Sequence, residues 1–212
     1  MAIRAIGIDF DNTIVIYDHL FYGLALEKKL IGRDVSPFKK SIRDTIRQLP
    51  GGDVEWQKLQ AMAYGANIGG AKVADGVLDF IKAARKRGLK VFIISHKTQF
   101  SNISLSPNYS IDLRRAALTW LKDNGFFDHD CVNPSQVIFA GTREEKIEKI
   151  CDTNCEAFID DLEETFLEPS FPPHVQKYLF LTGDQRPSDE ISRLNVRIAR
   201  SWKELYKQIL NE

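Results

Sequence analysis

The stretch Ala5-Ile6-Gly7-Ile8-Asp9-Phe10-Asp11-Asn12-Thr13 gives the first indication of the fold. Its first four residues form a short apolar run, which is typical of a strand that is buried on both faces of a sheet. Two acidic residues and a hydroxyl follow directly at the carboxyl end of that strand. In an open parallel sheet, ligands bind along the edge where the strands end. The stretch therefore predicts a buried strand with a polar site behind it.

Working outward, short apolar runs alternate with amphipathic stretches along most of the chain. Further strands are expected at residues 90–94, 137–140, 157–159, 178–181 and 196–199. Apolar residues at helical spacing predict helices over 77–86 and 112–124, and another helix from Ser201. Thr142 is expected to be the N-cap of a helix that contains Lys146. The pattern predicts an α/β protein with a Rossmann-like parallel sheet that is flanked by helices.

One segment near the N-terminus has no strand pattern. Residues 20–30, 38–49 and 54–64 are helical in pattern, and Ser36-Pro37 is expected to cap the second of these helices. We therefore expect a small helical insertion at residues 17–72, after the first strand. Residues 1–16 and 73–212 are then expected to form the α/β core.

Composition excludes several classes of protein. The 212 residues carry 29 basic and 29 acidic side chains, so no global field favours nucleic acid. No apolar run approaches the ~20 residues that span a bilayer. The short apolar run at residues 1–8 is not expected to be a signal peptide, because Asp9 and Asp11 end it. A cytoplasmic location without a membrane partner is expected, and the oligomeric state is not readable. Cys151 and Cys155 have a spacing that suits a helix face, but packing is preferred over a metal pair.

Polar residues follow the predicted strands in a chemically coherent set. Two carboxylates, Asp9 and Asp11, allow nucleophilic attack on phosphorus together with proton transfer. A hydroxyl and an ammonium, Ser95 and Lys146, suit the oxygens of a phosphoryl group. Magnesium prefers oxygen ligands, which Asp160-Asp161 provide after a later strand.

Asp9-x-Asp11-x-Thr13, Ser95, Lys146 and Asp160-Asp161, in this order, resemble the motifs of the haloacid dehalogenase superfamily of phosphatases. The resemblance implies that Asp9 is the nucleophile and a magnesium ligand. It implies that Asp11 is the general acid and base, with its backbone carbonyl on the metal. Dehalogenases and phosphonatases of this type carry another residue at the position of Asp11, so the resemblance favours a phosphatase.

The resemblance also implies roles for the remaining residues. Ser95 and Lys146 would bind the phosphoryl group, while Thr13 would support the phosphate loop or fix Asp11. Asp160 would bind magnesium directly, and Asp161 directly or through water. Lys149 competes with Lys146 for the role of the phosphate lysine. A polar stretch from Thr98 to Ser110 either lines the substrate pocket, with Lys97 offering a second positive charge, or is a surface loop.

The helical insertion lies where the superfamily places its type-one cap, which favours a small phosphorylated metabolite as substrate. Sugar phosphates and nucleotides fit this expectation equally well. Two alternatives to hydrolysis stay open. A phosphotransferase or mutase would use the same nucleophile, and a binding protein would retain the fold without catalysis.

Overall fold

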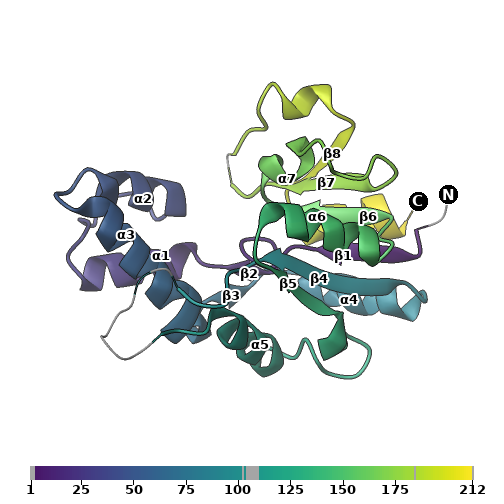
Figure 1. Cartoon of the computed structure of the whole chain (residues 1–212), viewed down its shortest axis with the longest axis horizontal. Helices are drawn as coiled ribbons and strands as arrows, with labels where there is room; N and C mark the ends of the chain where they lie inside the picture. Colours follow the sequence, from purple (N-terminus) through teal and green to yellow (C-terminus); the bar gives the residue numbers. More distant parts are fainter. Residues whose placement is uncertain (1–2, 102, 104–109, 184, 212) are drawn as a thin grey trace. The chain divides into compact units, whose positions relative to one another are not determined.

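In the computed structural model, which describes residues 3–101, 103, 110–183 and 185–211, the chain divides into two units (Figure 1). The sheet unit comprises Met1–Ile14, Val73–Lys97 and Asn124–Glu212. The helical unit comprises Val15–Lys72 and Thr98–Asp123. Two short strands, β2 (Val15–Ile16) and β3 (Lys72–Val73), pair with each other where the chain passes between the units.

The sheet unit contains a six-stranded parallel sheet with the order β5-β4-β1-β6-β7-β8. Its strands are β1 (Ala5–Ile8), β4 (Lys90–His96), β5 (Val137–Ala140), β6 (Ala157–Asp160), β7 (Gln176–Phe180) and β8 (Val196–Ala199). All six strands were expected from their apolar runs. The order places β1 between β4 and β6, so the three strands that precede Asp9, Ser95 and Asp160 are neighbours. The predicted α/β parallel sheet is confirmed.

Helices cover both faces of this sheet. They are α4 (Val77–Lys86), α6 (Arg143–Asp152), α7 (Glu163–Leu167) and α8 (Trp202–Leu205). Leu179 of β7 belongs to a buried cluster with residues of α6 and α7, whereas the next residue, Phe180, packs against Trp202 of α8. Adjacent strand residues point to opposite faces, so α6 and α7 lie on one face and α8 on the other. Phe80 of α4 also packs against Trp202.

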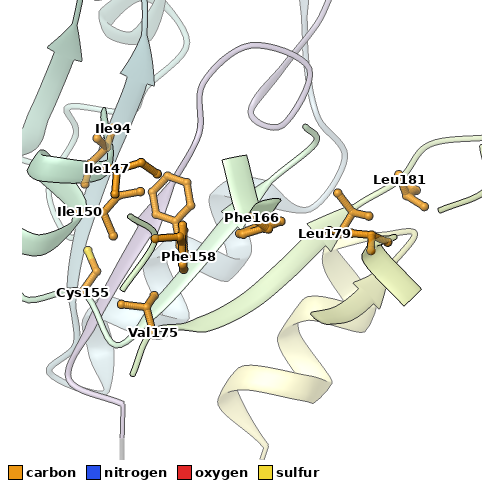
Figure 2. Packing of buried hydrophobic residues seen from close by; sticks show 11 residues of the cluster. Ile94, Ile147, Ile150, Cys155, Phe158, Phe166, Val175, Leu179 and Leu181 are labelled. Atoms are coloured by element: carbon orange, nitrogen blue, oxygen red, sulfur yellow. The ribbon is translucent and has the colours of Figure 1, made fainter. Parts of the chain in front are cut away.

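A buried hydrophobic cluster lies on the α6 side of the sheet (Figure 2). Its members are Ile94, Ile147, Ile150, Cys155, Phe158, Phe166, Phe171, Val175, Leu179, Leu181 and Ile191. Phe158 of β6 approaches β1 so closely that a Cβ atom at Gly7 would lie 2.5 Å from its ring carbon Cδ2. Close packing of β1 against this ring therefore requires glycine at position 7.

The helical unit contains four α-helices among the described residues. They are α1 (Asp18–Glu27), α2 (Lys39–Arg47), α3 (Gly52–Ala61) and α5 (Leu113–Asp123). A π-helical turn, Met62–Ala66, extends α3, and a 3-10 turn follows at Ile68–Gly70. The aromatic rings of Tyr17, Phe21, Trp56 and Tyr64 pack together in its interior.

The helical unit differs from the expected insertion in two respects. Thr98–Asp123, which the sequence pattern assigns to the α/β core, groups with the helices, and within this unit the indole nitrogen of Trp120 donates to the carbonyl of Ala71. Ser36 does not cap α2, because that helix begins at Lys39 and its backbone N–H donates to the carboxylate of Asp18. Residues 102 and 104–109 of the polar region after Lys97 lie outside the described residues.

Within the described ranges, none of the helices combines the length and the apolar character that crossing a bilayer requires.

Candidate functional site

The centre of the site is built by the ends of two neighbouring strands. Ile8 of β1 lies beside Ile159 of β6, and the backbone N–H of Asp9 donates to the carbonyl of Ile159 at 2.9 Å. This register places Asp9 and Asp160 at the same edge of the sheet. Both side chains are nearly fully buried, and Asp160 also accepts a hydrogen bond from the backbone N–H of Leu162.

Lys146 joins these two carboxylates. Its ammonium lies 2.6 Å from Oδ1 of Asp9 and 2.7 Å from Oδ2 of Asp160, and its side chain is only 2% exposed. Thr142, as expected, caps α6, because its hydroxyl accepts from the backbone N–H of Glu145 at 3.1 Å. Lys146 therefore lies in the first turn of a capped helix. Its ammonium also lies over the ring of Phe158, 5.4 Å from the centroid.

Burial dominates the electrostatics of Asp9. It raises the pKa of this carboxyl from 3.8 to about 7, with Lys146 acting in the opposite direction and Asp160 and Asp11 in the same one. Burial on its own would lower the pKa of the Lys146 ammonium. The charges and hydrogen bonds of Asp160 and Asp9 outweigh that effect and hold the pKa above its usual value. Lys146 therefore stays positively charged, whereas a further cation nearby would stabilise the ionised form of Asp9.

Three carboxylates at this edge lie close enough together to hold a metal ion. Oxygen atoms of Asp9, Asp160 and Asp161 all lie within 4.8 Å of one another. An all-oxygen donor set fits a hard divalent cation such as magnesium better than zinc or copper. The residues present therefore fit the expected cofactor, and Asp9, Asp160 and Asp161 would hold it.

The loop after β1 turns sharply toward the sheet unit's interior. The N–H of Ile14 donates to the carbonyl of Phe10, and Asn12 adopts the left-handed conformation with φ 58°. Asparagine tolerates this region better than most residues. Thr13 is fully buried, its hydroxyl has no hydrogen-bond partner among the described residues, and its carbonyl accepts from the indole of Trp202. Thr13 therefore anchors the loop from within the unit.

Asp11 contacts a lysine from the neighbouring strand end. The ammonium of Lys97 lies 2.8 Å from Oδ2 and 3.1 Å from Oδ1 of Asp11. The N–H of Lys97 continues the pairing of β4 with β5 by donating to the carbonyl of Ala140. Ser95, two residues earlier on β4, is 1% exposed at the same edge.

The structure places all the sequence-predicted site residues along the carboxyl edge of β1, β4 and β6 or at the start of α6. Lys149 lies outside this group, because its side chain is 42% exposed and pairs with Asp152. Sequence reasoning missed the contact between Lys97 and Asp11 and the position of Phe158 beneath Lys146. The sequence signal for the contact between Lys97 and Asp11 was a lysine two residues after Ser95, at the end of a strand.

Several solved structures share the fold of this chain. No family model matches the chain, and no curated protein matches it significantly. Three solved structures illustrate the likeness. Protein Tyrosine Kinase A from Mycobacterium tuberculosis is 15% identical with a TM-score of 0.65, and the match covers 98% of each chain. A haloacid dehalogenase-like family hydrolase from Streptococcus pneumoniae is 15% identical with a TM-score of 0.64, over 97% of this chain and 98% of its own.

A third similar structure is a HAD family hydrolase from Deinococcus radiodurans R1 with bound phosphate and sodium. It is 13% identical with a TM-score of 0.62, over 99% of this chain and 96% of its own. A dehalogenase is also among the similar structures, so the shared architecture hosts more than one chemistry. At these identities the likeness concerns the fold, and the chain has the haloacid dehalogenase-like fold.

Proposed function

We propose that the protein is a magnesium-dependent hydrolase of small-molecule phosphomonoesters, and that Asp9 carries the phosphoryl group as an aspartyl-phosphate. The observation that carries this proposal is the buried contact of Lys146 with both Asp9 and Asp160 beside a third carboxylate, Asp161. The fold supports it as well, since the similar hydrolase from Deinococcus radiodurans holds phosphate.

The charge balance of the site supports a divalent cation. Asp9, Asp11, Asp160 and Asp161 contribute four carboxylates, whereas Lys97 and Lys146 contribute two ammonium groups. When Asp11 is protonated for its role as acid, one negative charge remains, and it would repel a phosphate dianion. A magnesium ion held by Asp9, Asp160 and Asp161 would offset that repulsion and would supply polarisation of the phosphoryl oxygens.

The residues of the chain account for the chemical steps. An oxygen of Asp9 attacks phosphorus while the bond from phosphorus to the leaving oxygen breaks, and Asp11 supplies the proton which that oxygen needs. Water then attacks the aspartyl-phosphate, the bond from phosphorus to Asp9 breaks, and Asp11 takes the proton of the water. Lys146 holds Asp9 in place and balances charge on the transferring group.

The burial of the site restricts its substrates. The side chain of Asp9 is 6% exposed, so a phosphoryl group has to project from its carrier to reach it. A small phosphorylated metabolite, either a sugar phosphate or a nucleotide, meets this condition more readily than a phosphoserine on a folded protein surface.

The test is phosphate release from a panel of sugar phosphates, nucleotides and an aryl phosphate, with magnesium or with a chelator. Release that requires magnesium and is lost in Asp9→Asn is expected, because the amide cannot attack phosphorus. Asp152→Asn is the matched control, since it removes an exposed carboxylate that pairs with Lys149, and it should retain wild-type rates.

Two outcomes would contradict the proposal. Release at wild-type rate by Asp9→Asn would overturn the nucleophile. No phosphate release by folded wild-type protein, combined with phosphoryl transfer to an added alcohol, would assign the site to a phosphotransferase.

A further inference from the structure

Lys97 is a charged residue in an unusual environment. Its side chain is 3% exposed, although lysine is rarely buried without a compensating partner. A buried ammonium costs free energy that a well-packed apolar residue would not. The retention of a charge here therefore calls for a role beyond packing.

Asp11 supplies the compensation. Both of its carboxylate oxygens lie within hydrogen-bonding distance of the Lys97 ammonium, at 2.8 and 3.1 Å. The ammonium also lies 5.4 Å from the centroid of the Phe10 ring, the residue between the two aspartates. These contacts attach the loop after β1 to the end of β4, across 86 positions of sequence.

The two members of this ion pair are not equally accessible. The Asp11 side chain is 22% exposed, against 3% for Lys97. The carboxylate is therefore the member that a substrate can reach, and the ammonium lies behind it. This difference argues against direct binding of substrate by Lys97.

We propose that Lys97 is a positioning residue that fixes the carboxylate of Asp11 at the place where it meets the leaving-group oxygen. The inference rests on the proposed function, in which Asp11 exchanges a proton with that oxygen and later with water. The exchange requires a hydrogen-bonding distance between Asp11 and the reacting oxygen. An aspartate that rotates freely about its χ1 bond would spend only part of its time there.

The leaving group provides a test that a purely structural role would not satisfy. An alkyl phosphate needs a proton on its leaving oxygen as the bond to phosphorus breaks, whereas p-nitrophenyl phosphate releases a stable phenolate without one. The ratio kcat/KM covers the steps up to the departure of the leaving group. It should therefore respond to Lys97 with the alkyl substrate and much less with the aryl substrate.

The experiment compares wild-type protein with Lys97→Met and Lys97→Gln. The substrates are p-nitrophenyl phosphate and the alkyl phosphate that the wild type hydrolyses fastest. Lys97→Met should lower kcat/KM for the alkyl substrate ~10-fold or more, within the range of general acid catalysis. For the aryl substrate it should change kcat/KM by less than about threefold. Lys97→Gln keeps one donor for Asp11 and should recover part of the loss.

Lys149→Met is the matched control, because it removes a lysine from an exposed ion pair on α6. It should leave both ratios unchanged. Equal losses with both substrates in Lys97→Met, or a gain with the alkyl substrate, would overturn the positioning role while the proposed function stands. Absence of phosphate release by the wild type would overturn the proposed function and this inference together. If Lys97→Met fails to fold, the same comparison in Lys97→Gln decides.

Discussion

At the level of single residues, the buried charges of Asp9, Lys146 and Asp160 depend on one another. Two carboxylates at this separation would repel each other in a medium of low dielectric constant, and Lys146 offsets that repulsion. An ammonium buried alone would be equally unfavourable. The three buried charges therefore stabilise one another. Removing any one of them leaves the others uncompensated and lowers the free energy of unfolding.

Replacing Lys146 with Met tests this dependence. Methionine approximates the shape of the lysine stem, but it leaves Asp9 and Asp160 without their shared cation. Breaking a buried ion pair in this way typically costs ~3–5 kcal/mol. We expect a loss of that order in the free energy of unfolding, measured by urea denaturation in the presence of a chelator.

Magnesium should recover more stability in Lys146→Met than in the wild type, because the uncompensated carboxylates bind the cation as a substitute charge. Lys149→Met serves as the control, and its unfolding free energy should change by less than about 0.5 kcal/mol. Equal losses in the two variants would contradict the buried arrangement around Lys146.

At the level of elements, β1 combines two constraints. It lies between β4 and β6, so both of its edges are paired, and its Gly7 leaves room for the ring of Phe158. That ring in turn lies beneath the ammonium of Lys146. Packing within the sheet and the position of the site lysine are therefore linked through one aromatic side chain.

Gly7→Ala should destabilise the protein. The added methyl group overlaps the Phe158 ring, and overpacking of this kind costs ~1–3 kcal/mol. The urea midpoint of unfolding measures the loss. Gly23→Ala is the matched control, because no atom lies within 4 Å of its added Cβ and alanine favours the helix α1. A loss in Gly23→Ala as large as in Gly7→Ala would argue against the close approach of Phe158.

The strands of the sheet unit, the helix α4 and the starts of α6 and α8 were predictable because their signals are local, whereas the short helix α7 was not predicted. A strand buried on both faces is a continuous apolar run, as in Ala5–Ile8. The cap of α6 by Thr142 is likewise a local hydrogen bond. The cap of α2 was predicted wrongly, since its partner, Asp18, is 21 positions away and no local pattern reveals it.

The gathering of the candidate site residues at one edge of the sheet was predictable for a related reason. Parallel strands bring their carboxyl ends to one edge, so polar residues after β1, β4 and β6 had to approach each other. Which polar groups make contact is not encoded locally. The pairing of Lys97 with Asp11 and the choice of Lys146 over Lys149 depend on side-chain directions in the folded protein.

At the level of the whole molecule, the assignment of α5 shows the limit of periodicity. The apolar face of that helix was visible in the sequence, with Leu113, Ala117 and Trp120 on one side. Periodicity shows that a helix has a face to bury but does not identify its partner. The hydrogen bond from Trp120 to Ala71 lies within the helical unit, and α5 is part of that unit.

The stability of the molecule should depend on pH through Asp9. Its pKa is raised by burial from 3.8 to about 7, so the folded protein retains this proton at pH values where the unfolded chain has lost it. The stabilisation is complete below about pH 4 and is lost as the pH rises through 7. In chelator, this group should lower the unfolding free energy by a few kcal/mol between pH 5 and pH 8.

The measurement is a series of urea denaturations across this range, compared with Asp9→Asn, which has no carboxyl to titrate. The variant should lose most of this dependence on pH. Magnesium should restore stability to the wild type at pH 8, because a cation favours the ionised carboxylate. Identical pH profiles for the two proteins in chelator would contradict the burial of Asp9.

The contact of Lys146 with Asp9 and Asp160 also has a consequence for synthesis of the chain. Along the chain, Lys146 follows Asp9 by 137 positions, and the second carboxylate, Asp160, follows Lys146 by 14. Until β6 has emerged and paired with β1, Asp9 and Lys146 lack the carboxylate of Asp160 beside them. A chain that ends before β6 therefore lacks one of the two carboxylates that Lys146 contacts, and the buried set of charges is complete only once Asp160 is in place.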